Sequence, residues 1–160
     1  MKNNNILFEA KLRLFNTYKS VPDFKKAFDI INDLYVNFVD YKRVVILKNI
    51  IDISIELNKD NTDKYFMEIL EKGSEEDIVY SSRQLYGYFL KKKDYNKALF
   101  YIEYLVKYSL EEDKNSVLFD KAFILYKLDK LEESKTILET LKGSYADVFA
   151  LNDLLYNIYL

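Results

Sequence analysis

Two runs of acidic residues have the side chains that come closest to metal-binding chemistry in this sequence. The first run is Glu75–Asp77, and the second, Glu111–Asp113, repeats its residue types. Carboxylate oxygens are the ligands that Ca²⁺ and Mg²⁺ prefer, but the alternating Asp spacing and central Gly of a calcium loop are missing. Acidic residues also stabilise the first turn of a helix through its dipole. We therefore predict two helix starts, no metal site and no cofactor.

Side chains suited to catalysis are scarce. The chain contains no His and no Cys, which excludes the most common general base, the thiolate nucleophile and any disulfide. Ser81, Ser82 and Ser144 have no base that the sequence identifies as their partner, and no glycine-rich phosphate loop is present. We predict that the protein is not an enzyme.

The charge pattern also restricts the partners. Lys91–Lys93 could contact an anion, but three Lys at the C-terminal end of a helix are more simply explained by the helix dipole and by solvation of a turn. The net charge is −2 and the pI is near 5.4, so no positive field would attract nucleic acid. Glu9, Lys11 and Arg13 interrupt the apolar start that a signal peptide would need. No apolar run is long enough to span a membrane, and we expect a cytoplasmic location.

The composition predicts that the fold, and therefore any functional site, is built from helices. The 160 residues include only three Gly and one Pro, and Asn-Gly and Asp-Gly turns are absent, which favours an all-α fold over sheets and hairpin turns. Lys far outnumbers Arg, a usage typical of AT-rich bacterial genomes that carries no information on function. Apolar residues at helical period predict about nine helices in a single domain. The expected units are hairpins over 6–39, 41–73, 75–109 and 114–142, followed by a helix over 145–159.

Polar residues and glycines between these segments predict the helix ends. Ser20–Asp23 and Ser74–Asp77 have the form of capping boxes, and Asp40 and Ser144 could cap the helices that follow them. Gly73 suits a left-handed position at a helix C-terminus. We expect polar connections at 58–61 and at 111–115.

A fixed offset relates four parts of the chain. The small residues Ala27, Thr62, Ala98 and Ser134 are separated by 35, 36 and 36 positions. Large apolar residues follow each of them four and seven positions later, and precede each by nine. They are Ile31, Phe66, Ile102 and Leu138; Leu34, Ile69, Leu105 and Leu141; and Tyr18, Ile53, Phe89 and Leu125. A small residue lets two helices approach closely while the large ones fill the space between hairpins, so the pattern predicts stacked helical hairpins.

The segment from Ser82 to Leu110 carries this pattern most completely, with a polar turn followed by Tyr95 and then Ala98 three positions later. It resembles the tetratricopeptide repeat, whose period is about 34 residues. The resemblance extends over the whole chain as four copies and implies a right-handed α-solenoid that binds a protein or peptide. Since Phe15, Ile50 and Tyr86 replace the small residue of the family's first helix, a related helical-hairpin solenoid would fit the sequence almost as well.

In the family that the chain resembles, the first helix of each hairpin lines a concave groove that binds the partner. The resemblance therefore implies a partner-binding groove formed by Leu12, Asn16, Val44, Leu47, Ile51, Tyr80, Arg83, Gly87, Leu90, Phe119, Phe123 and Tyr126. Tyr, Phe and Arg dominate binding energy at interfaces, although packing between helices would explain the apolar members equally well. Because the family's clamp for a terminal carboxylate is matched only by Asn16, we expect an apolar helix or a peptide with hydrophobic anchors.

Three functions are compatible with such a chain. The first is an adaptor or chaperone-like scaffold that binds a partner protein in the groove. The second is a structural subunit that forms homo-oligomers through the C-terminal helix, whose apolar residues are Leu151, Leu154, Leu155, Ile158 and Leu160. The third is the peptide-sensing domain of a regulator. The sequence does not identify the partner.

Overall fold

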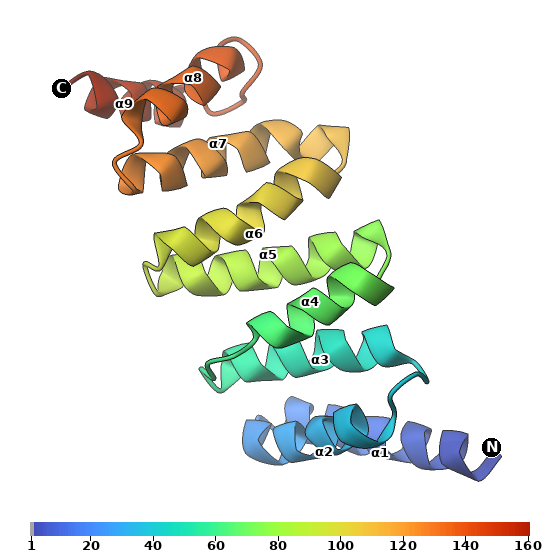
Figure 1. Ribbon diagram of the computed structural model, residues 1–160. Coiled ribbons are helices and arrows are strands. Elements are labelled where there is room, and N and C mark those ends of the chain that lie inside the picture. The colour runs from blue at the N-terminus through green and yellow to red at the C-terminus, as the bar shows by residue number, and fades with distance from the viewer. Residues whose placement is uncertain (1) are drawn as a thin grey trace. The chain divides into compact units, whose positions relative to one another are not determined.

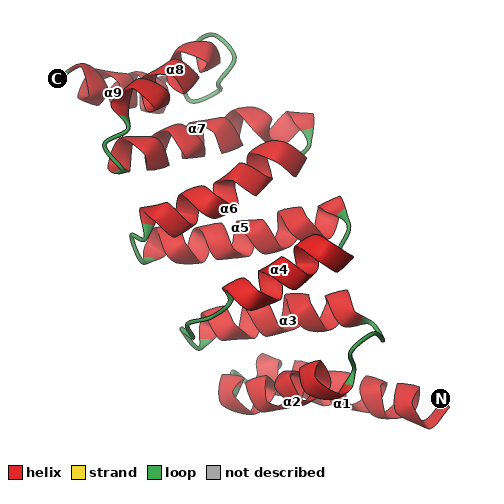
Figure 2. Cartoon of the chain, viewed as in Figure 1, coloured by secondary structure: helices red, strands yellow, loops and turns green. Residues whose placement is uncertain are grey.

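The structure, a computed structural model, describes residues 2–160, with side chains from residue 4 onward. Within that range the chain forms nine helices and no strands, which confirms the predicted all-α fold (Figures 1 and 2). The helices are α1 (Lys2–Ser20), α2 (Phe24–Asn37), α3 (Arg43–Glu56), α4 (Asp63–Lys72), α5 (Glu75–Lys91), α6 (Tyr95–Tyr108), α7 (Glu111–Lys127), α8 (Leu131–Leu141) and α9 (Val148–Tyr159).

The chain divides into two compact units, and the boundary lies inside α5. The N-terminal unit ends at Ser81 and the C-terminal unit begins at Ser82. In the N-terminal unit α1 packs on α2, α2 on α3, and α3 on α4. In the C-terminal unit α6 packs on α7, α7 on α8, and α9 contacts both α7 and α8. Within each unit the packing is therefore mainly between helices that are consecutive in the chain, as expected of helical repeats.

The residues of the predicted repeat form the core of both units. Ala27, Thr62, Ala98 and Ser134 are each no more than 1% exposed, so all four small residues lie where helices approach closely. The eight large residues four and seven positions later are also buried. Nine positions before the small residues, Tyr18 is half-buried and its three counterparts are buried. The register predicted from the sequence is confirmed.

The turn after the first helix of each copy is closed in the same way. A backbone N–H beyond the helix donates to a carbonyl five residues earlier, with distances of 2.9 Å (Asp23 to Tyr18), 2.8 Å (Lys59 to Ser54), 3.0 Å (Asp94 to Phe89) and 2.9 Å (Lys130 to Leu125). This bond is the six-residue closure of a Schellman-type C-terminus. In three copies its donor also begins the next helix as the N-cap residue, so one short turn both ends and starts a helix.

The second copy differs because its second helix begins late. Asn58 and Asn61 both have positive φ, and α4 begins only at Asp63, with Thr62 as its N-cap residue. This helix has 10 residues, whereas α2 and α6 have 14 each. The buried register is kept, but the first turn of the helix is replaced by loop.

Several predicted helix ends are wrong, and each has a local reason. Asp23, rather than a box beginning at Ser20, caps α2 by accepting from the N–H of Lys26. Asp40 caps nothing, since α3 begins after Lys42 in the left-handed conformation without a side-chain cap. Asp147, not Ser144, caps α9 by accepting from the N–H of Ala150.

Two further expectations about helix ends are corrected. The connection expected at 111–115 is helical, because Glu111–Asp113 form the acidic first turn of α7. Gly73 has an extended conformation, with φ −86° and ψ 162°, so it is not a left-handed terminus. A Cβ at Gly73 would lie 2.8 Å from the carbonyl oxygen of Ile69, so close approach explains the glycine. The Ser74–Asp77 box is confirmed, with the N–H of Ser74 donating to Asp77 and the N–H of Asp77 donating to Ser74 Oγ.

Candidate functional site

The predicted groove residues of the N-terminal unit do not form an open apolar surface. Leu47 and Ile51 are 0% exposed, so they are core residues and cannot contact a partner on the folded chain. Their prediction as binding residues is wrong because α3 buries more than one face. Leu12 and Val44 are half-buried, and Asn16 is exposed.

In the C-terminal unit the predicted groove residues divide into two groups. Phe119, Phe123 and Tyr126 are half-buried and pack against the core that α7, α8 and α9 share. The ring of Phe119 stacks on Tyr145 with centroids 4.6 Å apart. These three side chains therefore cover the core. Arg83 is exposed, and Leu90 and Gly87 are half-buried. A Cβ added at Gly87 would meet no neighbouring atom within 4 Å.

Polar contacts, which sequence reasoning missed, join the first helix of one copy to the first helix of the next. Lys42, which directly precedes α3, lies 2.5 Å from Glu9 of α1; Lys48 of α3 lies 2.8 Å from Asp77 of α5; and Arg83 of α5 lies 3.4 Å from Asp113 of α7. Asp77 and Asp113 each precede the small residue of their own copy by 21 positions, so the repeat offset could have revealed the relationship. The first helices are therefore linked by charge pairs.

Tyr80 takes part in a second contact between α3 and α5. Its hydroxyl donates to Oδ2 of Asp52 over 2.7 Å, and the ammonium of Lys48 lies 5.1 Å from the centre of its ring. Burial raises the pKa of Asp52, and Oδ1 of the same carboxylate is buried with no hydrogen-bond partner in the part of the chain that the structure describes. Burial, together with the Asp52 contact, raises the pKa of Tyr80 to about 12. Tyr80 is thus held in place by its neighbours although 39% of it is exposed.

A second partly buried carboxylate lies in the C-terminal unit. Burial raises the pKa of Asp120, while the charge of Arg83 acts in the opposite direction. The pKa of Tyr86 is raised as well, by burial first and then by the charge of Asp120. These shifts follow from burial within the helix packing, and among the described residues no group of three or more His, Cys, Asp or Glu could hold a metal ion.

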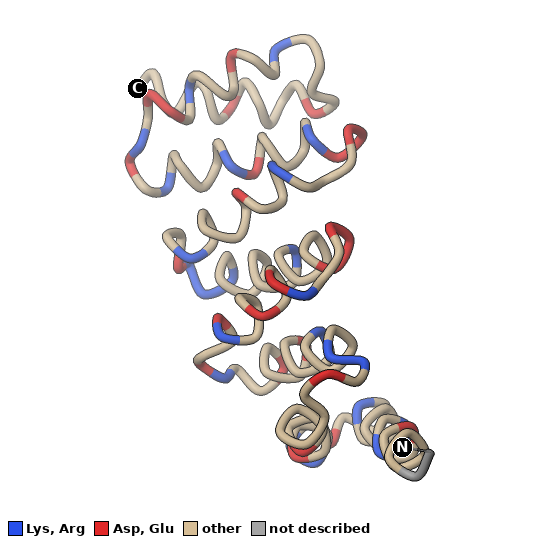
Figure 3. Tube along the Cα trace, turned by 45° about the vertical axis from the view of Figure 1, so that its right-hand side comes forward, with Lys and Arg blue, Asp and Glu red and all other residues tan. Residues whose placement is uncertain are grey.

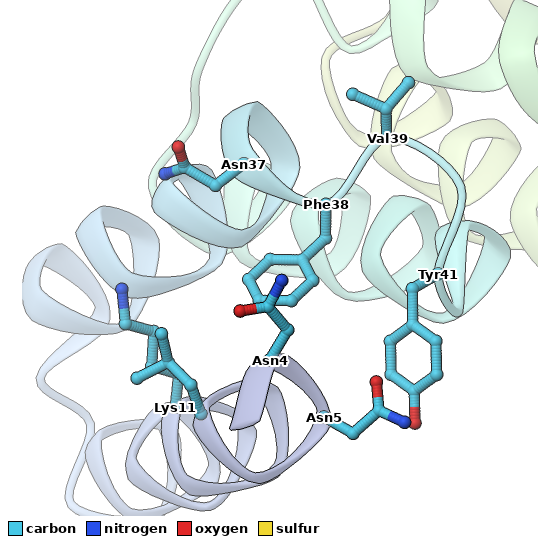
Figure 4. A pocket seen from close by; sticks show the side chains of 8 residues that line it. Asn4, Asn5, Lys11, Asn37, Phe38, Val39 and Tyr41 are labelled. Carbon is cyan, nitrogen blue, oxygen red and sulfur yellow. The ribbon is translucent and has the colours of Figure 1, made fainter. Parts of the chain in front are cut away.

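A cavity of 590 Å³ lies in the N-terminal unit, between the start of α1 and the loop from α2 to α3 (Figure 4). Its lining combines apolar side chains, amides and one Lys. The lining residues are Asn4, Asn5, Leu7, Lys11, Asn37, Phe38, Val39 and Tyr41. None of them belongs to the predicted groove. A cavity of this size with mostly apolar walls and a few polar groups is typical of ligand sites.

Aromatic packing forms the support of this cavity. Phe8 is 0% exposed, and the rings of Phe38 and Tyr41 meet it edge to face at centroid distances of 5.2 and 5.0 Å. Because the buried ring belongs to α1 and the other two belong to the loop, this cluster ties the loop to the helix. Phe38 and Tyr41, two of the residues that line the cavity, are therefore held in place by Phe8.

A partly buried ion pair also fixes this loop. Arg43 is 8% exposed; its Nε lies 2.6 Å from Oε1 of Glu68, and its Nη2 donates to Oε2 over 3.0 Å. Nη1 of Arg43 donates to the carbonyl oxygens of Tyr35 at 2.5 Å and Phe38 at 3.2 Å. The guanidinium also lies 4.0 Å from the centre of the Tyr35 ring. One side chain thus joins the end of α2, the loop and α4.

Two of the polar residues that line the cavity, Asn37 and Lys11, contact Asp33, and the other two are Asn4 and Asn5. Asn37 donates to the carbonyl and to Oδ1 of Asp33, and Lys11 forms an ion pair with Asp33. Figure 4 shows Asn4 and Asn5 on the α1 side and Val39 and Tyr41 on the loop side. Amide groups carry both donors and acceptors, which suits contact with a peptide backbone.

Besides the cavity, the outer face of α9 also exposes apolar side chains. Leu151, Leu154 and Leu155 are buried in the core of the C-terminal unit, so they are not the residues available for self-association. Other α9 residues and Leu160, which follows the helix, are exposed. They are Val148 (56%), Phe149 (83%), Tyr156 (62%), Tyr159 (61%) and Leu160 (85%).

Comparison with known proteins adds no family to these observations. No family model matches the chain, and neither a curated protein nor a solved structure matches it. The likeness to tetratricopeptide repeats therefore remains a resemblance in sequence pattern. None of the described helices combines the length and apolar character needed to cross a membrane. Positively and negatively charged residues are interspersed along the helices and turns (Figure 3).

Proposed function

We propose that the protein is a non-enzymatic interaction module that binds a peptide segment of a partner protein in the cavity beside α1. The observation that carries the proposal is the cavity itself, whose apolar walls are formed by Leu7, Phe38, Val39 and Tyr41. An apolar side chain of the peptide enters the cavity, and the nearby Asn amides bind its backbone. Adaptor or chaperone-like activity in the cytoplasm is the corresponding cellular role.

Selection from a library of short random peptides displayed on phage tests this proposal. Peptides with an aromatic or aliphatic anchor should be enriched on the full-length protein. Val39→Asp places a charge in the cavity and should weaken binding of the selected peptides at least about tenfold, about 1.4 kcal/mol. Val21→Asp is the matched control, because Val21 is also an exposed valine (62% against 60%) but does not line the cavity.

Two results would contradict the cavity as the site. The selected peptides could bind Val39→Asp and Val21→Asp equally well, or no peptide could be enriched although both proteins remain folded. After either result, self-association through the outer face of α9 would be the remaining candidate function.

We infer self-association through α9 as a second candidate function. The observation that favours it is the row of exposed apolar residues at Val148, Phe149, Tyr156, Tyr159 and Leu160. Exposed apolar surface of this kind in a row along one helix commonly marks a protein interface.

A further inference from the structure

Asp120, on α7, is a half-buried carboxylate that has no partner. It forms neither a hydrogen bond nor an ion pair with any residue of the described chain. Removing a carboxylate from water without such a partner costs free energy. At the same register position of the second copy, Lys48 is paired with Asp77 over 2.8 Å. Asp120 therefore carries a charge that the folded chain itself does not use.

Two tyrosines from other segments lie close to this carboxylate. Tyr86 of α5 is 9% exposed, and Tyr145, between α8 and α9, is half-buried. Burial raises the pKa of both tyrosines, and the charge of Asp120 raises it further. Neither hydroxyl forms a hydrogen bond within the part of the chain that the structure describes. None of the oxygen atoms of these three residues is fully buried, so a ligand can reach them.

Aromatic rings and open space adjoin the carboxylate. Phe119 directly precedes Asp120 and stacks on Tyr145, with the ring centroids 4.6 Å apart and an angle of 12° between the rings. Both rings pack against the core of the C-terminal unit, which fixes their position. On α5, Gly87 follows Tyr86 and has no atom within 4 Å of an added Cβ, so this face of the helix is not covered. An open carboxylate beside aromatic rings suits a cation.

We propose that Asp120, Tyr86 and Tyr145 bind the ammonium group of a lysine side chain from a partner protein. The negative charge of Asp120 complements the ammonium. An ammonium has three donors, which matches one carboxylate and two phenolic oxygens as acceptors. A guanidinium has five donors in one plane and would leave some of them without acceptors here.

Arg83 restricts the ligand to a single positive charge. Its guanidinium lies 3.4 Å from Asp113, so it is engaged with a different carboxylate. Its charge nevertheless acts on Asp120 and would repel a second cation nearby. A lysine side chain brings one ammonium to the site, whereas a short diamine such as putrescine brings two. The structure therefore favours a protein as the source of the ammonium.

Nuclear magnetic resonance of the full-length, ¹⁵N-labelled protein tests the proposal. The probe is the peptide acetyl-Gly-Lys-Gly-amide, and we expect saturable shifts in amide signals of α5 and α7 with a dissociation constant on the order of 1 mM. Acetyl-Gly-norleucine-Gly-amide has a side chain of similar length without the ammonium, and should bind at least about tenfold more weakly. Putrescine should also bind more weakly than the lysine peptide.

Variants then assign the site. Asp120→Asn should weaken binding of the lysine peptide at least about tenfold, because it removes a charged acceptor. Asp129→Asn is the matched control: it removes the same charge from an exposed turn, where φ is 60° and Asn is also tolerated. Tyr145→Phe keeps the stack with Phe119 and removes one acceptor, so it should weaken binding about threefold.

Stability provides a readout that does not require a ligand. Since Asp120 has no partner among the described residues, Asp120→Asn should raise the midpoint of thermal unfolding at neutral pH. The same measurement establishes that the variant is folded. A lower midpoint would show that the carboxylate stabilises the fold, and would overturn the proposal.

Three binding results would also overturn it. The first is the absence of saturable shifts with the lysine peptide at concentrations up to about 20 mM. The second is equal binding of the lysine and norleucine peptides, and the third is equal binding by Asp120→Asn and Asp129→Asn. Tighter binding of putrescine than of the lysine peptide would overturn a protein as the source of the ammonium. The site belongs to the C-terminal unit, so none of these results bears on peptide binding in the cavity beside α1.

Discussion

The hydroxyl of Tyr80 on α5 and the carboxylate of Asp52 on α3 are joined by a hydrogen bond of 2.7 Å, in which Tyr80 is the donor. The bond connects two helices that begin successive copies of the repeat. It also partly compensates for the burial of Asp52, whose second oxygen has no hydrogen-bond partner in the described chain. The contact therefore links α3 to α5 and involves a carboxylate whose pKa is raised by burial.

This contact makes a prediction about pH. Because the pKa of Asp52 is raised above 3.8 in the folded chain, the folded chain binds this proton more tightly than the unfolded chain does. The contribution of Asp52 to stability is therefore most favourable below about pH 3.8 and falls as the pH rises through the raised value. Urea unfolding should be measured for the wild type and for Asp52→Asn as a function of pH. The free energy of unfolding of the wild type minus that of Asp52→Asn should fall as the pH rises. A difference that rises with pH would contradict the assignment.

Tyr80→Phe removes the hydrogen bond and keeps the ring. We expect a loss of about 1 kcal/mol in the free energy of unfolding at neutral pH, together with a further rise in the pKa of Asp52. Tyr95→Phe is a suitable control, since it makes the same chemical change at the start of α6. Equal losses in the two variants would show that the Asp52 contact has no special importance.

The third prediction concerns Arg43, whose guanidinium binds Glu68 and two backbone carbonyls. Arg43→Ala leaves Glu68 and these carbonyls without their donor, and should cost about 3 kcal/mol in the free energy of unfolding. Lysine cannot reproduce the paired geometry, so Arg43→Lys should recover less than half of this loss. Denaturant unfolding followed by circular dichroism measures both effects. Full recovery in Arg43→Lys would mean that charge alone is sufficient.

The fourth prediction tests the small residue of the repeat. Ala98 is 0% exposed between helices, so Ala98→Leu should overpack the site and cost about 2 kcal/mol. Ala98→Ser should cost much less, because Ser134 occupies the equivalent position and donates to the carbonyl of Ala122 over 2.7 Å. Thermal unfolding of the two variants provides the comparison. If Ala98→Leu were as stable as the wild type, the close approach of helices at this position would be excluded.

The fifth prediction compares two glycines. Gly143 has φ 82°, which favours glycine, whereas Gly87 lies inside α5 and has nothing within 4 Å of an added Cβ. Gly143→Ala should therefore destabilise the chain by about 1 kcal/mol, and Gly87→Ala should stabilise it by a similar amount. Opposite shifts in the midpoint of thermal unfolding are the expected result. Stabilisation by Gly143→Ala would contradict the backbone assignment.

The helices and their buried register could be predicted from the sequence because both follow from local periodicity. The positions of Ala27 and Ala98, and of the large residues after them, required only the spacing of apolar residues. Helix ends were less predictable because several polar residues compete for each cap. Asp40 has a suitable side chain, but Arg43 and the aromatic contacts of Phe38 and Tyr41 determine the path of this loop.

The candidate site could not be predicted in the same way. Leu47 and Ile51 were assigned to a groove from their register alone, but whether a helix buries one face or several depends on its neighbours. The cavity is formed by α1 together with a loop about 30 residues further along the chain, at positions outside the repeat register. Its apolar residues at the ends of helices, such as Leu7 and Val39, were the only signal in the sequence.

The polar contacts between first helices have a consequence for how the chain folds. The contacts of Glu9 with Lys42, Lys48 with Asp77, and Arg83 with Asp113 span 33, 29 and 30 residues. Closing a loop of this length costs little more than forming one hairpin, so stability can accumulate copy by copy along the chain. Since each of these contacts joins only neighbouring copies, folding can start at more than one point along the chain.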